Sequence, residues 1–159
     1  MLAAYLDAIA MTERLHRQFL EIVKVELESQ GMHDLNNVQA MILFNIGELD
    51  MTIGELTLRG CYLGSNVSYN VKKMAENGYI QQERSLHDRR SIRVRLTDKG
   101  ERVRKLIMAM VERHLGQLAQ GPLDEAALTQ ALVAFRRLDR FWTQSLSIGP
   151  RLAGLSSAA

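Results

Sequence analysis

The sequence predicts a mainly α-helical protein that carries one small two-stranded β-hairpin. Three observations support this fold class. Apolar residues recur at three- and four-residue steps over most of the chain, which is the period of an amphipathic helix. Between residues 79 and 96 the period changes to two, as expected for strands. The chain has 159 residues, so one domain, or one domain with a helical extension, is the default organisation.

Two helices are expected before residue 50. The first covers residues 3–29, ends at Gly31, and has an apolar stripe formed by Leu6, Ile9, Leu15, Phe19, Ile22, Val23 and Leu27. The second begins after a cap at Asn36 or Asn37, because an Asn side chain accepts a hydrogen bond from a free amide of the first turn. It ends near Gly47, and its apolar residues are Val38, Met41, Ile42 and Leu43.

A short helix and a longer one follow in the middle of the chain. Thr52 and Glu55 form a capping box, in which the hydroxyl and the carboxylate each satisfy a backbone amide, and this predicts a helix over 53–59. The longer helix covers 65–77 and stops at Asn77-Gly78. Its apolar face consists of Val67, Val71 and Met74, and the face opposite these residues is polar and basic.

The hairpin is predicted from an alternating pattern. Tyr79–Arg84 forms one candidate strand, and a short polar link at 85–91 is typical of a hairpin tip. The second strand places apolar residues inward and arginines outward, because Ile92, Val94 and Leu96 alternate with Arg93 and Arg95.

Two more helices complete the chain. Thr97 is expected to cap a helix over 98–119 that carries Val103, Leu106, Ile107, Met110 and Leu118. Gly121-Pro122 breaks this helix. The last helix, 124–146, has a stripe formed by Leu128, Leu132, Phe135, Leu138 and Trp142. Residues 149–159 are expected to form a flexible tail.

Several classes of protein are excluded by what the sequence lacks. No apolar run approaches the roughly 18 residues of a membrane span, and the start of the chain does not resemble a signal peptide. The single cysteine, Cys61, excludes an internal disulfide and fits a cytoplasmic protein. No phosphate loop, nucleophile motif or zinc-ligand spacing is present. We therefore expect no enzymatic activity, no cofactor and no metal.

The charge is unevenly distributed along the chain. Residues 1–50 carry three Lys and Arg against eight Asp and Glu, whereas residues 51–110 carry twelve against six. Residues 111–159 are close to neutral. A basic segment between an acidic and a neutral one indicates a polyanionic partner for the middle of the chain.

The middle segment has the chemistry of a DNA reader. A helix fits the major groove, where Asn, Ser, Tyr and Lys can meet base edges and phosphates. Five of the fourteen residues from Glu83 to Leu96 are arginine, and guanidinium is attracted by the negative potential of a minor groove. Asp88 could hold a neighbouring arginine by a bidentate pair. A solvated loop is the alternative, but the preceding helices and the charge asymmetry favour DNA.

These residues also resemble a known family. The stretch GYIQQERSLHDRRSIRVRLTDKG is similar to the wing signature of the MarR family, with Arg84, then Asp88-Arg89-Arg90, then Val94-x-Leu96-Thr97-x-x-Gly100. The stretch NVSYNVKKMAENGYI resembles the recognition helix of that family. The resemblance covers nearly the whole chain, and RGCYLGSNVSYNVKK is similar to an alphaproteobacterial subgroup typified by LdtR and PetP.

The resemblance implies a homodimeric winged helix-turn-helix regulator. Residues 1–34 and 101–148 would form the dimerisation helices and residues 35–100 the DNA-binding domain. The helix residues implied to face the major groove are Ser65, Asn66, Ser68, Tyr69, Lys72 and Lys73. The residues implied to form and support the wing are Arg84, Asp88, Arg89, Arg90 and Arg93. A small-molecule effector crevice would involve His16, Phe19, Met41, Phe44 and Met108.

Some residues allow more than one interpretation. Tyr69 could pack on a neighbouring element instead of facing DNA. Cys61 is more simply a structural residue than a redox sensor, because a sensor needs a lowered pKa and access. His16 and His114 lie on different predicted helices and could approach each other to hold a ligand or a metal.

The function predicted from the sequence is a sequence-specific, dimeric, DNA-binding transcriptional regulator. A repressor modulated by a small molecule, acting on double-stranded DNA with a pseudo-palindromic operator, fits best. The alternatives are a winged-helix protein-interaction module, a redox-responsive regulator acting through Cys61, and a small-molecule-binding helical bundle with an incidental basic patch.

Overall fold

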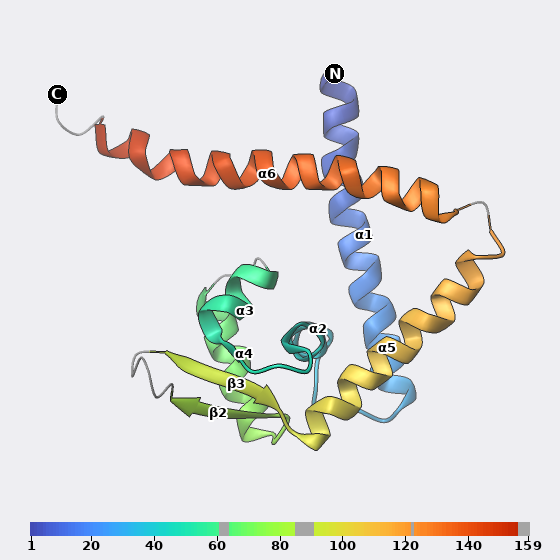
Figure 1. Cartoon of the computed structure of the whole chain (residues 1–159), viewed down its shortest axis with the longest axis vertical. Coiled ribbons are helices and arrows are strands. Elements are labelled where there is room, and N and C mark those ends of the chain that lie inside the picture. Colours follow the sequence, from blue (N-terminus) through green and yellow to red (C-terminus); the bar gives the residue numbers. More distant parts are fainter. Residues whose placement is uncertain (61–63, 85–90, 122, 156–159) are drawn as a thin grey trace. The chain divides into compact units, whose positions relative to one another are not determined.

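The computed structural model describes the backbone of residues 1–60, 64–84, 91–121 and 123–155 (Figure 1). The elements are, in chain order, α1 (Leu2–Ser29), α2 (Asn37–Ile46), β1 (Met51–Thr52), α3 (Ile53–Gly60), α4 (Gly64–Glu76), β2 (Ile80–Arg84), β3 (Ile92–Leu96), α5 (Asp98–Leu118) and α6 (Glu125–Leu155). The chain divides into two compact units, Met1–Glu112 and Arg113–Ala159. The mainly α-helical fold class is confirmed.

The helix caps explain where the predicted helices begin. Asn36 is the cap of α2, since its side-chain oxygen accepts a hydrogen bond from the Gln39 amide at 2.8 Å while Gln39 Oε1 accepts one from the Asn36 amide at 3.1 Å. Thr52 Oγ1 accepts from the Glu55 amide at 3.1 Å, and Glu55 Oε2 accepts from the Thr52 amide at 2.7 Å. Both capping boxes satisfy backbone donors that a helix leaves unpaired.

The sheet has one more strand than the sequence predicted. β1 pairs antiparallel with β3, with Met51 opposite Val94, and the strand order is β1-β3-β2. A two-residue strand is too short to show an alternating pattern, and its formation depends on a partner far along the chain. The predicted hairpin strands are confirmed in antiparallel register, with Arg84 opposite Ile92.

The last helix is longer than expected. The sequence predicted an end at residue 146, whereas α6 continues to Leu155. The prediction ended the helix where its apolar stripe ends, but backbone hydrogen bonds do not require a stripe. α4 likewise begins at Gly64, one residue before the predicted start.

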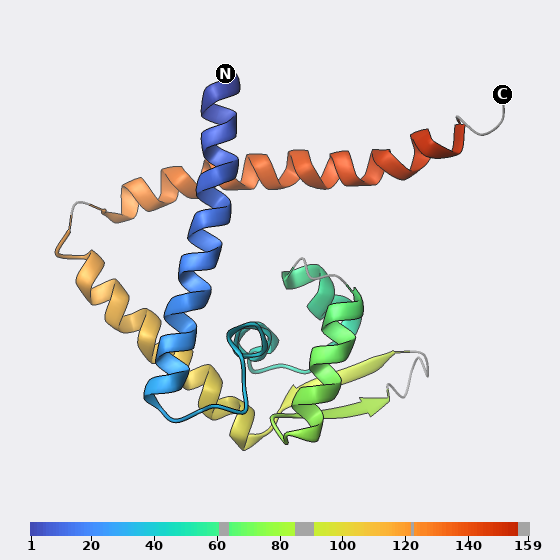
Figure 2. The same cartoon turned by 180° about the vertical axis from the view of Figure 1, so that it is seen from behind.

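The hydrophobic core lies within the first unit. All its buried apolar residues fall between Val23 and Met110. α2 packs against α1 on one side and α3 on the other, while α4 packs against β2 (Figures 1 and 2). Within the described part of the chain, no helix combines the length and apolar character needed to cross a bilayer. The core therefore holds α4 and the sheet in fixed positions, which leaves their outer faces free.

Candidate nucleic-acid interface

Packing decides which face of α4 is presented to solvent. Val67, Val71 and Met74 are fully buried, so the rows between them must point outward. The exposed side chains include five of the six predicted to face the major groove, namely Asn66, Ser68, Tyr69, Lys72 and Lys73. The sixth, Ser65, lies in α4, but its side chain is outside the part that the structure describes. The outer face of α4 is therefore polar and basic, as the sequence predicted.

Tyr69 is one of the more exposed large side chains of this unit. It is 69% exposed, so packing on a neighbouring element does not account for its position. It lines a small open groove of about 300 Å³ together with Lys73 from α4, with His33 and Asn36 from the turn before α2, and with Gln39 from the first turn of α2. An exposed aromatic ring beside a lysine can stack on a sugar or a base while the ammonium meets a phosphate.

The arginines of the hairpin differ in how far the structure describes them. Arg84 is exposed at the end of β2. Arg93 Nη2 donates a hydrogen bond to the Asp50 carbonyl at 3.1 Å, which leaves its other donors available. The predicted wing residues Asp88, Arg89 and Arg90 lie outside the described residues.

Arg95 is used within the sheet. Its Nη2 contacts Glu83 Oε1 at 2.8 Å and its Nε donates to Gln81 Oε1 at 2.8 Å. Glu83 therefore forms an ion pair with an arginine of the neighbouring strand. Since Gln81 and Glu83 both project from β2, Arg95 fastens the two strands of the hairpin across their outward face.

Arg104 joins α5 to the loop that follows α2. Its guanidinium donates to both oxygens of Glu101, at 2.8 and 2.7 Å, and to Glu48 Oε1 at 3.0 Å. The hydrogen bonds from Arg104 hold the pKa of the Glu101 carboxyl below its usual range. Sequence reasoning missed this group, and the only local signal was the three-residue spacing of Glu101 and Arg104.

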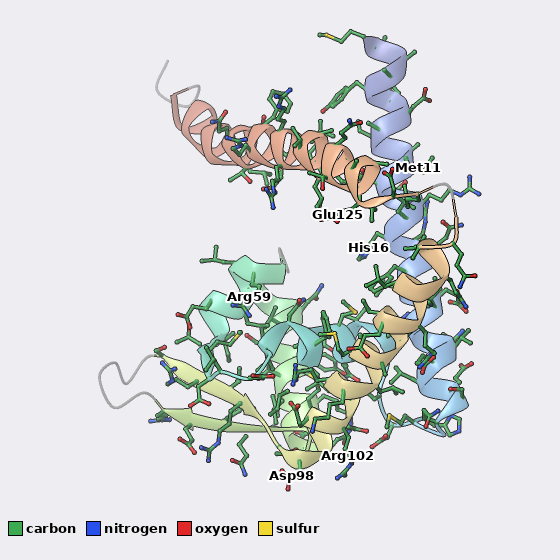
Figure 3. The ribbon with its side chains drawn as sticks, turned by 45° about the vertical axis from the view of Figure 1, so that its right-hand side comes forward. Met11, His16, Arg59, Asp98, Arg102 and Glu125 are labelled. Atoms are coloured by element: carbon green, nitrogen blue, oxygen red, sulfur yellow. The ribbon has the colours of Figure 1, made fainter. Side chains whose placement is uncertain are left out.

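A pocket of about 520 Å³ opens between α1 and α2. Three of the five predicted effector residues, His16, Phe19 and Met41, line it, and His16 is seen on α1 in Figure 3. Phe44 and Met108 are not among its described lining residues. Phe44 packs on the core, and Met108 is partly exposed on α5. The lining residues that the sequence did not indicate are Leu20, Val38, Asn45 and Gly60.

Arg59 precedes Gly60 in the sequence and contacts Asn45, and both of these residues line the pocket. Its Nη1 donates a hydrogen bond to the carbonyl of Asn45 at 2.8 Å, and Figure 3 shows it near the end of α3. The pocket therefore has apolar walls from Phe19, Val38 and Met41 and polar groups at His16 and Asn45. This combination suits a small, largely apolar molecule with one or two polar substituents.

The described residues give no support for a metal site or for a redox switch. Among the described residues, no group of three or more His, Cys, Asp and Glu side chains could hold a metal ion. His16 and His114 fall in different compact units, so their expected approach stays a prediction. Cys61 lies outside the described residues.

Comparisons with known proteins agree with this geometry. Residues 35–100 match the family described as winged helix DNA-binding domain. Over 148 residues the chain is 34% identical to the exopolysaccharide II synthesis transcriptional activator ExpG of Rhizobium meliloti (strain 1021), covering 93% of this chain and 76% of that protein.

Two solved structures share the fold. FabT of Streptococcus pneumoniae in complex with DNA aligns with a TM-score of 0.70 and 20% identity, covering 88% of this chain and 98% of that one. MarR of Staphylococcus aureus in complex with salicylate and kanamycin aligns with a TM-score of 0.71 and 19% identity, covering 89% and 94%.

The winged-helix match, the polar outer face of α4 and the relative together define a winged-helix DNA-binding transcriptional regulator, not an enzyme. The chain belongs to the MarR family. Membership of the subgroup typified by LdtR and PetP stays a prediction.

Proposed function

We propose that the protein acts as a homodimer that reads a pseudo-palindromic operator. Each α4 enters a major groove, and the two half-sites lie about one helical turn apart. The observation that carries this proposal is the outer face of α4, where Asn66, Tyr69 and Lys73 are exposed because the opposite face is buried in the core. A polar and basic face favours DNA over a protein partner, for which an apolar face would be expected.

Exposed apolar side chains support the homodimer. On α1, Leu2, Leu6, Ile9 and Leu15 are exposed, and on α6 Leu132, Phe135 and Phe141 are exposed as well. Exposed apolar side chains that gather on a helix are typical of surfaces that a partner covers. An isologous pairing of α1, α5 and α6 would bring the basic segments of both protomers, residues 51–110, onto one duplex. The acidic N-terminal segment would stay away from the DNA.

We further propose that the pocket lined by His16, Phe19 and Met41 receives a small-molecule effector. The MarR structure with salicylate supports the idea for this fold, although salicylate was bound to that protein. Occupancy can change DNA affinity only if the effector binds one arrangement of the two protomers better than the other. Redox control through Cys61 is the alternative, and treatment with peroxide would then alter DNA binding of the parent but not of Cys61→Ser.

The sign of regulation has two candidates. The sequence favoured a repressor, while the relative from Rhizobium meliloti is a transcriptional activator. A reporter gene with the operator placed upstream of the promoter or across it would separate activation from repression. Because the DNA ligand lies in the cytoplasm, we expect the protein there.

The first experiment is a titration of the purified protein against DNA from upstream of its own gene and against a random duplex, at several salt concentrations. We expect tight, salt-dependent binding that prefers one sequence. Equal and weak binding to both duplexes would call for selection from random DNA, and failure to select any sequence would overturn the DNA-reading function.

A further inference from the structure

The turn between α1 and α2 carries one acidic residue that is bonded to two distant segments. Asp34 Oδ1 accepts a hydrogen bond from the Tyr79 hydroxyl at 2.7 Å, and Asp34 Oδ2 contacts the Lys99 ammonium at 2.9 Å. Asn77 Nδ2 donates to the Asp34 carbonyl at 3.2 Å. We call Asp34, Asn77, Tyr79 and Lys99 the Asp34 junction.

The Asp34 junction lies where α4 ends and α5 begins. Asn77, Gly78 and Tyr79 directly follow α4, and Lys99 is in the first turn of α5. The Lys99 ammonium also donates to the Asn77 carbonyl at 3.1 Å and lies 4.0 Å from the centre of the Tyr79 ring. One lysine thus contacts every other member of the junction.

Neighbouring backbone contacts make this point of the fold tight. Thr97 Oγ1 donates a bifurcated hydrogen bond to the Gly78 and Tyr79 carbonyls, at 2.7 and 3.0 Å. Gly78 has φ +74°, a conformation in which a side chain would be strained. A Cβ on Gly100 would meet the Tyr79 carbonyl oxygen at 2.2 Å. The exit of α4 and the start of α5 are therefore in direct backbone contact.

The charge states agree with the geometry. Hydrogen bonds from Lys99 and Tyr79 hold the pKa of the Asp34 carboxyl below its usual range. Burial, together with the Asp34 carboxylate, raises the pKa of the Tyr79 hydroxyl, and the hydrogen bond to Asp34 raises the pKa of Lys99. At neutral pH the junction is a carboxylate held by two protonated donors.

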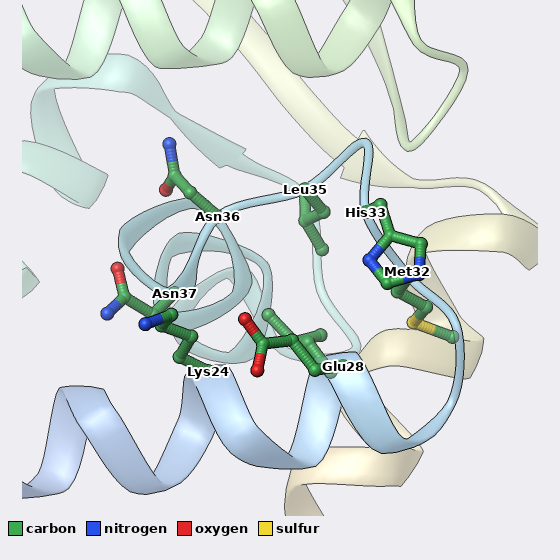
Figure 4. A pocket seen from close by; sticks show the side chains of 8 residues that line it. Lys24, Glu28, Met32, His33, Leu35, Asn36 and Asn37 are labelled. Atoms are coloured by element: carbon green, nitrogen blue, oxygen red, sulfur yellow. The ribbon is translucent and has the colours of Figure 1, made fainter.

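The turn that carries Asp34 is attached to α1 as well. Figure 4 shows Lys24 and Glu28 of α1 beside Asn36 and Asn37 at the start of α2, around a pocket of about 220 Å³. Asn37 Nδ2 donates to the Leu20 carbonyl of α1 at 3.0 Å. The Asp34 junction thus connects the end of α4 to a turn that is itself anchored on α1.

The hydrogen bonds of the Asp34 junction constrain the end of α4 in direction as well as in distance. The buried face of α4 is held by apolar contacts, which are non-directional, and the hydrogen bonds at the end of the helix add a directional constraint to them. Hydrogen bonds at one end of the helix fix its axial position, because their strength falls steeply with distance and angle. The axial position of α4 decides where its exposed residues meet the DNA.

We propose that Asp34, Tyr79 and Lys99 are positioning residues that set the separation of the two reading helices in the dimer. Because α1 and α5 are two of the three helices proposed to build the dimer, the junction links these dimer helices to α4. This role rests on the homodimer proposed above. Its consequence is selectivity for the spacing of the operator half-sites.

The test uses the full chain and the operator obtained by selection from random DNA. Three duplexes are compared: the native spacing, one base pair inserted at the centre, and one removed, each change shifting the half-sites by about 3.4 Å. The variants are Asp34→Ala, Tyr79→Phe and Lys99→Met. Glu21→Ala is the matched control, because Glu21 forms an exposed ion pair with Lys24 at 3.2 Å on α1, outside the junction.

We expect the parent and the control to prefer the native spacing by about tenfold or more, and Asp34→Ala to reduce that preference to about threefold or less. Tyr79→Phe, which keeps the buried ring, should give an intermediate value and guards against misfolding of Asp34→Ala. Affinity for a random duplex should not change, since phosphate contacts remain.

Two results would overturn the inference. One is a parent preference that survives in all three variants, and the other is an equal loss of affinity on all three duplexes, which is what a purely structural role gives. A parent that has no spacing preference at all would overturn the dimeric function together with this inference, so the two failures are distinguishable.

Discussion

The first compact unit, Met1–Glu112, contains the winged helix and is called the head below. The head and the last helix use apolar residues in opposite ways. In the head, residues such as Leu43, Leu56 and Ile107 are completely buried. In α6, none of the described side chains between 125 and 146 is buried, and Leu132, Phe135 and Phe141 are 50%, 43% and 56% exposed. The apolar residues of the head are therefore buried within the chain, whereas those of α6 remain in contact with solvent, which is unfavourable.

The contrast shows which part of the molecule can be stable alone. The head encloses its own core and fixes α4 from within the chain. α6 has the periodicity of a packed helix, but its stripe needs a surface to cover it. Different regions should thus respond differently to substitution, with the head losing stability and α6 losing assembly.

The largest effect is expected from a charge placed in the α6 stripe. Phe135→Glu should yield a monomer and lower operator affinity by about 100-fold or more, because a carboxylate buried in an apolar interface is unpaired. Sedimentation equilibrium and DNA titration measure the two effects. Arg140→Glu, which is exposed about 80° or more around the helix from Leu132, Phe135 and Phe141, is the control and should stay dimeric. A dimeric Phe135→Glu with parental affinity would show that α6 is not an interface.

The head should respond to a single added methyl group. Gly100→Ala should lower the free energy of unfolding by about 3 kcal/mol, because the new Cβ would lie 2.2 Å from the Tyr79 carbonyl oxygen and the backbone must move. Gly116→Ala, also in α5, has nothing within 4 Å of the new Cβ and should be neutral or stabilising by up to about 1 kcal/mol. Urea denaturation compares the two, and equal effects would refute a tight contact at Gly100.

Substitutions on the outer face of α4 should change DNA binding without changing stability. Asn66→Ala should weaken operator binding by about 1–3 kcal/mol with little effect on random DNA, whereas Lys73→Ala should weaken both and reduce the salt slope by about 1. Titrations on the two duplexes at several salt concentrations measure this. Lys105→Ala is the control, since Lys105 is exposed on α5, outside the proposed DNA interface. Equal losses on operator and random DNA for Asn66→Ala would exclude base reading by Asn66.

The smallest effect concerns the pH dependence of the head. Asp34 has a pKa below its ordinary value of 3.8, so its contribution to stability is present above that value and is lost as the pH falls through the lower folded-state pKa. Because the side chain is half exposed, Asp34→Asn should cost only about 0.5 kcal/mol at neutral pH. The difference in urea midpoint between Asp34→Asn and the parent should be the same at pH 7 and pH 5 and smaller at pH 3, and a constant difference across this range would refute the charge-based cause.

Local patterns in the sequence predicted most of the head. The Asn cap of α2, the capping box at Thr52, the buried face of α4 and the two hairpin strands follow from neighbours in the chain, so their signals can be found without knowing the fold. The exposed residues of α4 followed at once from the buried ones.

Contacts between distant residues could not be predicted in this way. Asp34 contacts Tyr79 and Lys99, and Arg104 contacts Glu48, yet nothing near these residues in the sequence indicates their partners. The pocket was predicted in part through the family resemblance, which indicated His16, Phe19 and Met41, whereas Val38 and Asn45 became apparent only once α1 and α2 were packed.

The short strand β1 has a consequence for solubility. β1 and β2 are the two edge strands of the described sheet, and β1 is only two residues long. The β2 edge is polar and charged at Gln81, Glu83 and Arg84. Such edges are poor templates for a strand from another molecule, because short length and charge disfavour edge-to-edge pairing. Both free edges of the described sheet are therefore protected against pairing with a strand from another copy of the protein.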